Sequence, residues 1–286
     1  MTGRIQGMIV ATLTPFDERG VNAAELERHV AFLAEGGMPA VAPAGTTGEF
    51  LYLSEEERTE AVRASVRAAA GRLKVIAGIW ALDVDGVGRL ARAAERAGAD
   101  AVFLTTPIYY PIRDEGVVEW YRAARRHTGL PLYAYNIPQY AVNGVSVAAL
   151  RVLMDEGTVQ GIKDSTGKPE RVQELLDVCR ERIAVYGASD SFALRARRMG
   201  VDGFISALAN IYPATFARIW EGDEAAQAAI DRVRSAVKGY GGIGGLKALL
   251  ATRGFDFGGT RLPFGNLSAA ECEELEREVA ELPGLE

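Results

Sequence analysis

The feature of the sequence that most constrains the fold is a regular alternation of short apolar runs and amphipathic stretches. Eight runs rich in Val, Ile and Leu recur about every thirty residues, and a helical pattern follows each of them. They cover residues 8–13, 40–43, 74–79, 101–104, 132–135, 159–163, 183–186 and 203–206. Continuous apolar runs of this length are typical of parallel strands that are buried on both faces.

Eight strand–helix units favour an α/β protein built as a closed (β/α)8 TIM barrel. An open doubly wound sheet shows the same alternation, but it favours a Gly-x-Gly-x-x-Gly motif after the first strand, where this chain has Thr-Leu-Thr-Pro-Phe. Three more helical patterns follow the eighth run, over residues 224–237, 243–252 and 269–282. We therefore predict a catalytic barrel over residues 1–222 and a C-terminal helical extension over residues 223–286, packed on the barrel.

Helix starts can be predicted from single residues. Asn22, Ser54 and Ser268 are each followed three positions later by Glu, which is the pattern of an N-cap residue with its capping partner. We expect a helix to begin after each of the three.

Composition excludes several classes of protein. The formal net charge is −6, and 32 basic residues are interleaved with 38 acidic ones, so no basic patch for nucleic acid is evident. No stretch is long and apolar enough to span a membrane, and we interpret the apolar N-terminal run as the first strand, not a signal peptide. The two cysteines, Cys179 and Cys272, fall in helical patterns, which favours a reducing, cytoplasmic location.

In barrel enzymes the reacting groups lie at the C-terminal ends of the strands, and Lys163 occupies such a position. It is one of few lysines in an arginine-rich chain, and it ends an apolar run where an ammonium group would be poorly solvated. Burial favours the neutral amine, which is a nucleophile toward carbonyl carbon. Two alternatives are an ion pair with adjacent Asp164 and a side chain that extends to solvent.

Two other strand ends carry groups that a Schiff-base reaction of a 2-oxo acid requires. The turn at residues 45–48, Gly-Thr-Thr-Gly, offers hydroxyl and backbone N–H donors for a carboxylate. Tyr135 offers a phenol for proton transfer. The alternative interpretations are an ordinary turn and a packing tyrosine.

Other chemistries find less support in the sequence. His29 and His127 lie in helical patterns away from any metal-binding cluster, so we expect no metal and no cofactor. The glycine-rich segment 239–245 precedes a helix and could bind phosphate, but its place beyond the eighth strand favours a turn that links two helices. No Gly-x-Ser-x-Gly motif of a serine hydrolase is present.

Together these segments resemble the dihydrodipicolinate synthase/N-acetylneuraminate lyase superfamily of class I aldolases. The resemblance runs from residues 14–16 through 45–49, 135–138 and 161–164 to 203–210. It implies a (β/α)8 barrel with C-terminal helices, a homotetramer arranged as a dimer of dimers, and a lysine imine with pyruvate or a related 2-oxo acid. By the same resemblance the catalytic residues are Lys163, Tyr135, Thr46 and Tyr109, with Tyr109 reaching the neighbouring subunit's site, and the substrate-binding residues are Thr47, Gly48, Ile205 and Tyr140.

The departures from the family pattern bear on the substrate. Synthases of this family carry an arginine two residues after the proline of the Tyr-Asn-x-Pro motif, where this chain has Tyr140. We therefore expect a lyase that cleaves a 2-keto-3-deoxy sugar acid to pyruvate and an aldehyde. The alternatives are a dihydrodipicolinate synthase that condenses pyruvate with aspartate semialdehyde, and a non-catalytic barrel that binds a 2-oxo acid.

Overall fold

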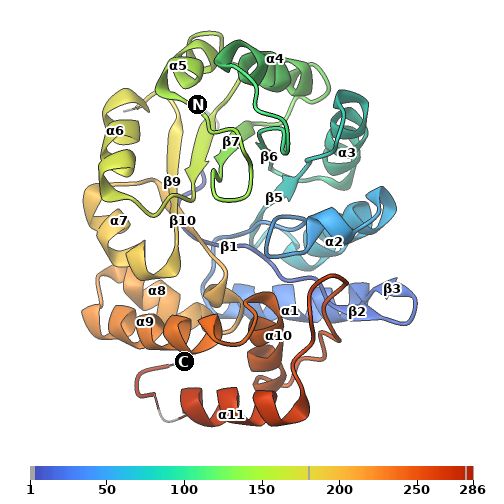
Figure 1. The fold of residues 1–286 in the computed structure, drawn as a ribbon, viewed down its shortest axis with the longest axis vertical. Helices are drawn as coiled ribbons and strands as arrows, with labels where there is room; N and C mark the ends of the chain where they lie inside the picture. The colour runs from blue at the N-terminus through green and yellow to red at the C-terminus, as the bar shows by residue number, and fades with distance from the viewer. Residues whose placement is uncertain (1–3, 180, 281, 286) are drawn as a thin grey trace.

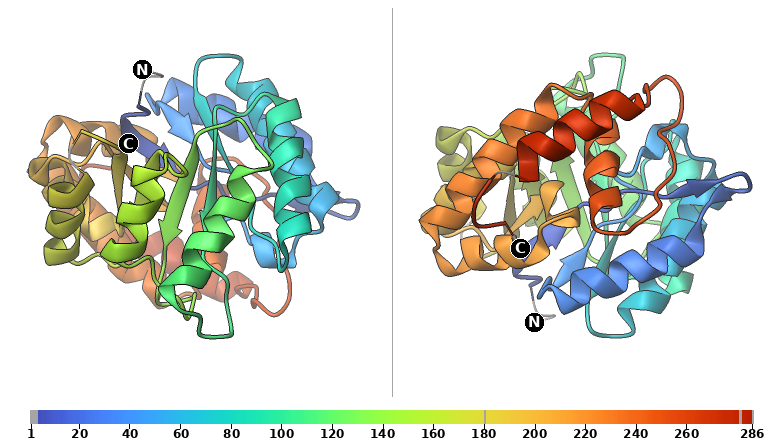
Figure 2. Two further views of the ribbon diagram at one scale, coloured as in Figure 1. Left: turned by 90° about the horizontal axis from the view of Figure 1, so that it is seen from above. Right: turned by 90° about the horizontal axis from the view of Figure 1, so that it is seen from below.

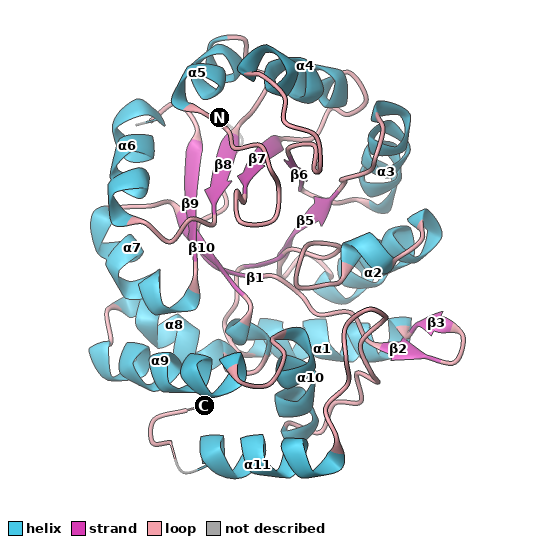
Figure 3. Cartoon of the chain, in the orientation of Figure 1, coloured by secondary structure: helices cyan, strands magenta, loops and turns pink. Residues whose placement is uncertain are grey.

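The fold is a closed barrel of eight parallel strands surrounded by helices (Figures 1 and 3). The computed structural model describes residues 4–179, 181–280 and 282–285. Around the barrel the strands follow the order β1-β10-β9-β8-β7-β6-β5-β4, and β4 pairs with β1 to close it. Their bounds are β1 Gly7–Val10, β4 Ala40–Val41, β5 Lys74–Gly78, β6 Ala101–Thr105, β7 Leu132–Asn136, β8 Gly161–Asp164, β9 Ala184–Ala188 and β10 Gly203–Ser206.

Each of the eight predicted apolar runs overlaps one barrel strand, so the predicted fold class is confirmed. The ends differ by up to three residues. Some runs contain apolar residues that do not join the ladder, and some strands include Gly, Thr, Asn or Asp residues that the apolar pattern does not mark. β8, for example, begins at Gly161, two residues later than predicted. A small antiparallel pair, β2 (Phe16–Asp17) with β3 (Gly20–Val21), was not predicted.

The core has two layers. Inward-facing side chains such as Ile9, Ile76 and Tyr186 fill the barrel, and a larger apolar layer lies between the strands and the helices. Successive residues of a strand point to opposite faces, so each strand supplies both layers and must be apolar throughout.

The helices that cover the barrel lie outside the strands in both views of Figure 2. They are α1 Ala23–Glu35, α2 Glu55–Ala69, α3 Val84–Ala97, α4 Asp114–Arg125, α5 Val147–Asp155, α6 Pro169–Cys179, α7 Ala193–Met199 and α8 Pro213–Glu221. Three short 3-10 helices accompany them: η1 Phe50–Tyr52, η2 Asp190–Phe192 and η3 Leu208–Asn210.

The predicted helix starts are confirmed. The side chain of Asn22 accepts a hydrogen bond from the Glu25 backbone N–H. Ser54 and Glu57 form a reciprocal capping box, and Ser268 makes the same two bonds with its own glutamate three residues later.

The C-terminal extension consists of α9 Glu224–Lys238, α10 Ile243–Thr252 and α11 Ala269–Ala280, which lie together beside α8 and α1 in Figure 1. Residues 239–242 of the glycine-rich segment link α9 to α10, as predicted, whereas residues 243–245 begin α10 itself. A domain boundary after residue 222 stays a proposal, supported by Gly222, which ends α8 in a left-handed conformation.

The two histidines and two cysteines have no shared site. His29 is buried in α1 and packs against Phe255 and Phe257. His127 lies two residues after the end of α4, so its predicted place inside a helix is wrong by two residues. Both cysteines are free thiols. Within the described residues, no helix is long and apolar enough to cross a membrane.

Candidate active site

Lys163 and Tyr135 stand side by side inside the C-terminal end of the barrel. They are directly paired in the parallel register of β7 and β8, so their side chains point to the same face. The Lys163 Nζ lies 3.9 Å from the centroid of the Tyr135 ring and 5.9 Å from that of Phe103. Lys163 is only 8% exposed. The amine is therefore enclosed by aromatic rings and largely shielded from water.

Neither alternative interpretation of Lys163 is supported. Asp164, the next residue, points to the other face of β8 and accepts hydrogen bonds from the Asn136 side chain at 2.7 Å and the Thr166 backbone N–H at 3.0 Å. Arg171 lies 3.6 Å from the same carboxylate. Asp164 thus has its own partners, and Lys163 does not reach the exposed surface.

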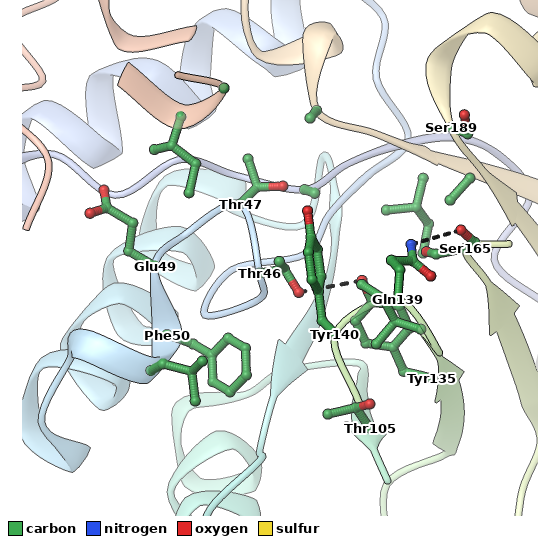
Figure 4. Close-up of a pocket in the computed structure, with 18 of the residues that line it drawn as sticks. Thr46, Thr47, Glu49, Phe50, Thr105, Tyr135, Gln139, Tyr140, Ser165 and Ser189 are labelled. Carbon is green, nitrogen blue, oxygen red and sulfur yellow. Dashed lines mark hydrogen bonds between the residues drawn. The ribbon is translucent and has the colours of Figure 1, made fainter. Parts of the chain in front are cut away.

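Thr46 connects the loop after β4 to this pair. Its hydroxyl lies 3.4 Å from the phenol oxygen of Tyr135, and either group can donate (Figure 4). The loop is shaped by Ala44, which has a positive φ of 57°, and by Gly78 on β5. A Cβ at Gly78 would lie 2.1 Å from the Ala44 carbonyl oxygen, so only glycine lets the loop approach this closely.

A pocket of about 820 Å³ opens above Lys163, a volume suited to a small-molecule substrate. Six of the eight predicted site residues line it: Lys163, Tyr135, Thr46, Thr47, Ile205 and Tyr140. Figure 4 shows Thr46, Thr47, Tyr135 and Tyr140 around one space, although they come from two distant segments, the loop after β4 and the end of β7 with its loop.

The other two predicted residues do not line the pocket. Gly48 faces away, toward Thr12 and Thr14, and its N–H donates to the Gly45 carbonyl, so it shapes the turn. Tyr109 is 78% exposed at a positive φ of 80° and stacks edge-to-face on Tyr110. Within one chain, therefore, Tyr109 does not extend the Thr46–Tyr135 pair.

Polar groups surround the outer part of the pocket. Gln139 donates to the Ser165 carbonyl at 2.9 Å, and Ser165 and Ser189 also line the space (Figure 4). Ser206, at the end of β10, does not line the space, because it is fully buried and accepts a hydrogen bond from the Ala209 backbone N–H.

Asp190 is a site residue that the sequence did not single out. It lines the pocket and is buried, and one of its carboxylate oxygens, Oδ1, has no hydrogen-bond partner among the described residues. Burial raises the pKa of this carboxyl above its usual range, against the lowering effect of hydrogen bonds from Ser206 and Leu208. Because this oxygen has almost no accessible surface, it does not face the pocket.

The C-terminal extension also takes part in the site, which sequence reasoning missed. Gly241, Gly242, Ile243 and Leu246 line the pocket. Their place beyond the eighth strand gave no signal of this.

A buried ion pair fastens the extension to the loop after β4. Lys247 on α10 lies 2.8 Å from the Glu49 carboxylate, and both side chains are almost fully buried. Glu49 also accepts the Arg261 backbone N–H at 2.8 Å, and Lys247 donates to the Gly259 carbonyl at 2.8 Å. Desolvation lowers the pKa of Lys247, and Glu49 partly offsets this effect. Because Glu49 directly follows the Thr-Thr-Gly turn, the pair holds that turn in place.

No group of three or more His, Cys, Asp and Glu side chains in the described part of the chain is placed to hold a metal ion. The chemistry of the pocket is that of an amine, a phenol and hydroxyl groups.

Comparison with known proteins gives consistent results. A model described as the dihydrodipicolinate synthetase family matches residues 4–282. The chain is 36% identical over 290 residues to a 4-hydroxy-tetrahydrodipicolinate synthase of Methylococcus capsulatus, with 98% of this chain and 99% of the relative covered. A chloride-inhibited dihydrodipicolinate synthase of Acinetobacter baumannii, solved with pyruvate, superposes with a TM-score of 0.89 at 31% identity and covers 97% of this chain and 99% of its own. A sialic acid aldolase of Ruminococcus gnavus shares the fold, with a TM-score of 0.91 at 21% identity over 97% of this chain and 96% of its own.

Proposed function

The chain belongs to the dihydrodipicolinate synthetase family, and from this premise we propose that it is a Schiff-base lyase that cleaves a 2-keto-3-deoxy sugar acid to pyruvate and an aldehyde. The observation that carries the proposal is the buried Lys163 amine, paired in register with Tyr135 at the base of an open pocket. A protein that only binds a 2-oxo acid has no use for a buried amine beside a phenol.

In the proposed reaction the Lys163 amine adds to the C2 carbonyl of the substrate, and loss of water gives an imine. In that dehydration Tyr135 gives its phenol proton to the departing hydroxyl, which leaves a protonated imine and a phenolate. The phenolate then accepts the proton of the C4 hydroxyl while the C3–C4 bond breaks and the aldehyde leaves. The electron pair of that bond moves into the imine to form an enamine. Protonation at C3 and hydrolysis then release pyruvate and free the amine. The amine belongs to the chain, so the reaction needs no cofactor.

The other pocket residues have matching roles in this proposal. Thr47 binds the substrate carboxylate through its hydroxyl, and Ile205 packs against the C3 carbon. Thr46, 3.4 Å from the phenol, passes the proton between Tyr135 and the outer pocket.

The experiment that tests the covalent step is borohydride trapping with pyruvate. We expect one reduced pyruvyl group per chain at Lys163, located by peptide mass mapping, and loss of adduct and turnover in Lys163→Ala. Lys168→Ala is the matched control, because Lys168 is exposed just after the same strand. An adduct at Lys74 or Lys247, or no adduct, would contradict the mechanism and favour a binding protein.

The outer pocket supports a polyhydroxylated aldehyde half. Gln139, Ser165 and Ser189 present neutral donors and acceptors there. Tyr140, which is 72% exposed, can donate one neutral hydrogen bond but cannot neutralise a carboxylate.

A second candidate is the condensation of pyruvate with aspartate semialdehyde, favoured by the name of the Methylococcus relative. We expect kcat/KM for cleavage of 2-keto-3-deoxygluconate to exceed that for this condensation. If the condensation is faster by tenfold or more, the synthase assignment replaces ours.

We also propose a homotetramer arranged as a dimer of dimers. The exposed rings of Tyr109 and Tyr110 after β6 support a subunit contact at this loop. Light scattering should give the mass of four chains, and Tyr109→Ala should lower kcat if Tyr109 completes a neighbouring site.

A further inference from the structure

The charges that line the pocket are unevenly distributed. Its acidic groups are Glu49, which is paired with Lys247, and Asp190, which is buried. Its cationic side chains are Lys163 at the base and Arg234 from α9. Lys163 is used for the imine in the proposed function. Arg234 is therefore the remaining pocket cation that can bind an anionic group of the substrate, at a distance from the reacting carbonyl.

Arg234 is held in place without a salt bridge. Its Nη1 donates to the Ser191 hydroxyl at 3.0 Å, and no carboxylate of the described residues lies within 4.0 Å of it. The buried Asp190 is nevertheless near enough for the guanidinium to oppose the rise in the pKa of that carboxyl. Gln227, seven residues earlier on the same face of α9, bonds the Asp190 carbonyl at 3.0 Å and the Leu194 N–H at 2.9 Å. These bonds hold α9 against η2, which follows β9. The position of α9 in turn places the Arg234 guanidinium at the pocket.

A second source of positive potential lies at the same rim. α10 begins at Ile243 directly after the pocket-lining Gly241 and Gly242, and no side chain caps its first N–H groups. The N-terminus of a helix carries a partial positive charge that favours an anion. This effect adds to the charge of Arg234.

We infer that Arg234 selects substrates whose aldehyde half ends in an anionic group, either a carboxylate or a phosphate. This inference rests on the proposed function and narrows it, from 2-keto-3-deoxy sugar acids in general to those with a second charge at C6. The hydroxyls between the two ends meet the neutral groups of Gln139, Ser165 and Ser189, while the terminal anion meets the guanidinium.

Three substrates that differ only at C6 test the inference: 2-keto-3-deoxygluconate, which is uncharged there, 2-keto-3-deoxyglucarate, with a carboxylate, and 2-keto-3-deoxy-6-phosphogluconate, with a phosphate. We expect kcat/KM for one charged substrate to exceed that for the uncharged one by roughly tenfold to 150-fold, the range for a hydrogen bond to a charged group. Whichever charged substrate is preferred identifies the anion.

The variants assign this preference to one residue. Arg234→Gln should bring the charged-to-uncharged ratio of kcat/KM close to one, and Arg234→Lys should retain part of it. Arg232 is exposed on the same helix but does not line the pocket. Arg232→Gln therefore removes the same charge and should leave the charged-to-uncharged ratio of kcat/KM unchanged.

Pyruvate trapping at Lys163, measured in every variant, separates the two proposals and reports a folded site. If trapping succeeds but the wild-type protein shows no preference, or the preference survives in Arg234→Gln, the role of Arg234 is wrong and the Schiff-base proposal stands. If trapping succeeds and none of the three substrates is cleaved, the substrate class is wrong. If trapping fails in the wild-type protein, the proposed function itself is wrong.

Discussion

Replacing Lys247 with methionine should destabilise the protein far more than the same substitution at an exposed lysine. Methionine keeps much of the apolar stem but removes the ammonium, which leaves the buried Glu49 carboxylate without its ion-pair partner. Breaking a buried pair in this way costs about 3–5 kcal/mol. We expect a value near the lower end, about 3 kcal/mol, because Glu49 keeps the Arg261 N–H at 2.8 Å.

Lys74→Met is the matched control. Lys74 pairs with Asp100 at 2.7 Å, a distance like that of the buried pair, but its side chain is 59% exposed. Exposed pairs contribute about 0–1 kcal/mol, so burial alone distinguishes the two sites. In the double variant Glu49→Gln/Lys247→Met no charge is left unpaired, and we expect part of the lost stability to return.

Urea unfolding at one protein concentration measures these differences, with KM for cleavage of 2-keto-3-deoxygluconate as a second readout. Because Glu49 follows the turn that carries Thr46 and Thr47, Lys247→Met should also raise KM, whereas Lys74→Met should not. The reasoning is refuted if Lys247→Met costs no more free energy of unfolding than Lys74→Met.

Three further predictions concern catalysis, regulation and pH. Tyr135→Phe should lower kcat by about 10²- to 10⁴-fold with the fold intact, and a change of only a few-fold would make Tyr135 a packing residue. Millimolar lysine should not inhibit, because the apolar side chains of Phe50 and Leu51 after the Gly-Thr-Thr-Gly-Glu turn, and of Ile108 before Tyr109, cannot bind an amino acid's charged ends; a clear inhibition curve would overturn this. Burial lowers the pKa of His29 to about 4. Between pH 6.5 and pH 4 the unfolded chain therefore binds a proton at this residue that the folded chain does not. The free energy of unfolding should fall by up to about 3 kcal/mol from this effect as the pH drops from about 7 to below about 4. Denaturation curves of His29→Gln should show a correspondingly weaker loss, and an equal loss in both proteins would contradict the buried neutral histidine.

The sequence by itself determined the barrel and the base of the candidate site. A strand buried on both faces must be apolar along its length, and a helix on a sheet must be apolar on one side, so both patterns are visible in local sequence. A lysine that ends such a strand is conspicuous because burial disfavours its charge. The strand ends of a barrel meet at one edge, so the sequence alone places Lys163, Tyr135 and Thr46 at one site.

Only the tertiary structure decided how the outer pocket is built. Arg234 and Lys247 lie on helices beyond the eighth strand. Nothing in the sequence around such a residue indicates which distant side chain it will contact. Their contacts with Ser191 and Glu49 depend on how α9 and α10 pack against loops far away in the sequence. Gly48 was expected in the site but does not line it. Its N–H donates to the Gly45 carbonyl inside the turn, although the adjacent Thr47 lines the pocket. The direction in which each group of a turn points, and the contacts between distant segments, depend on how the whole chain packs.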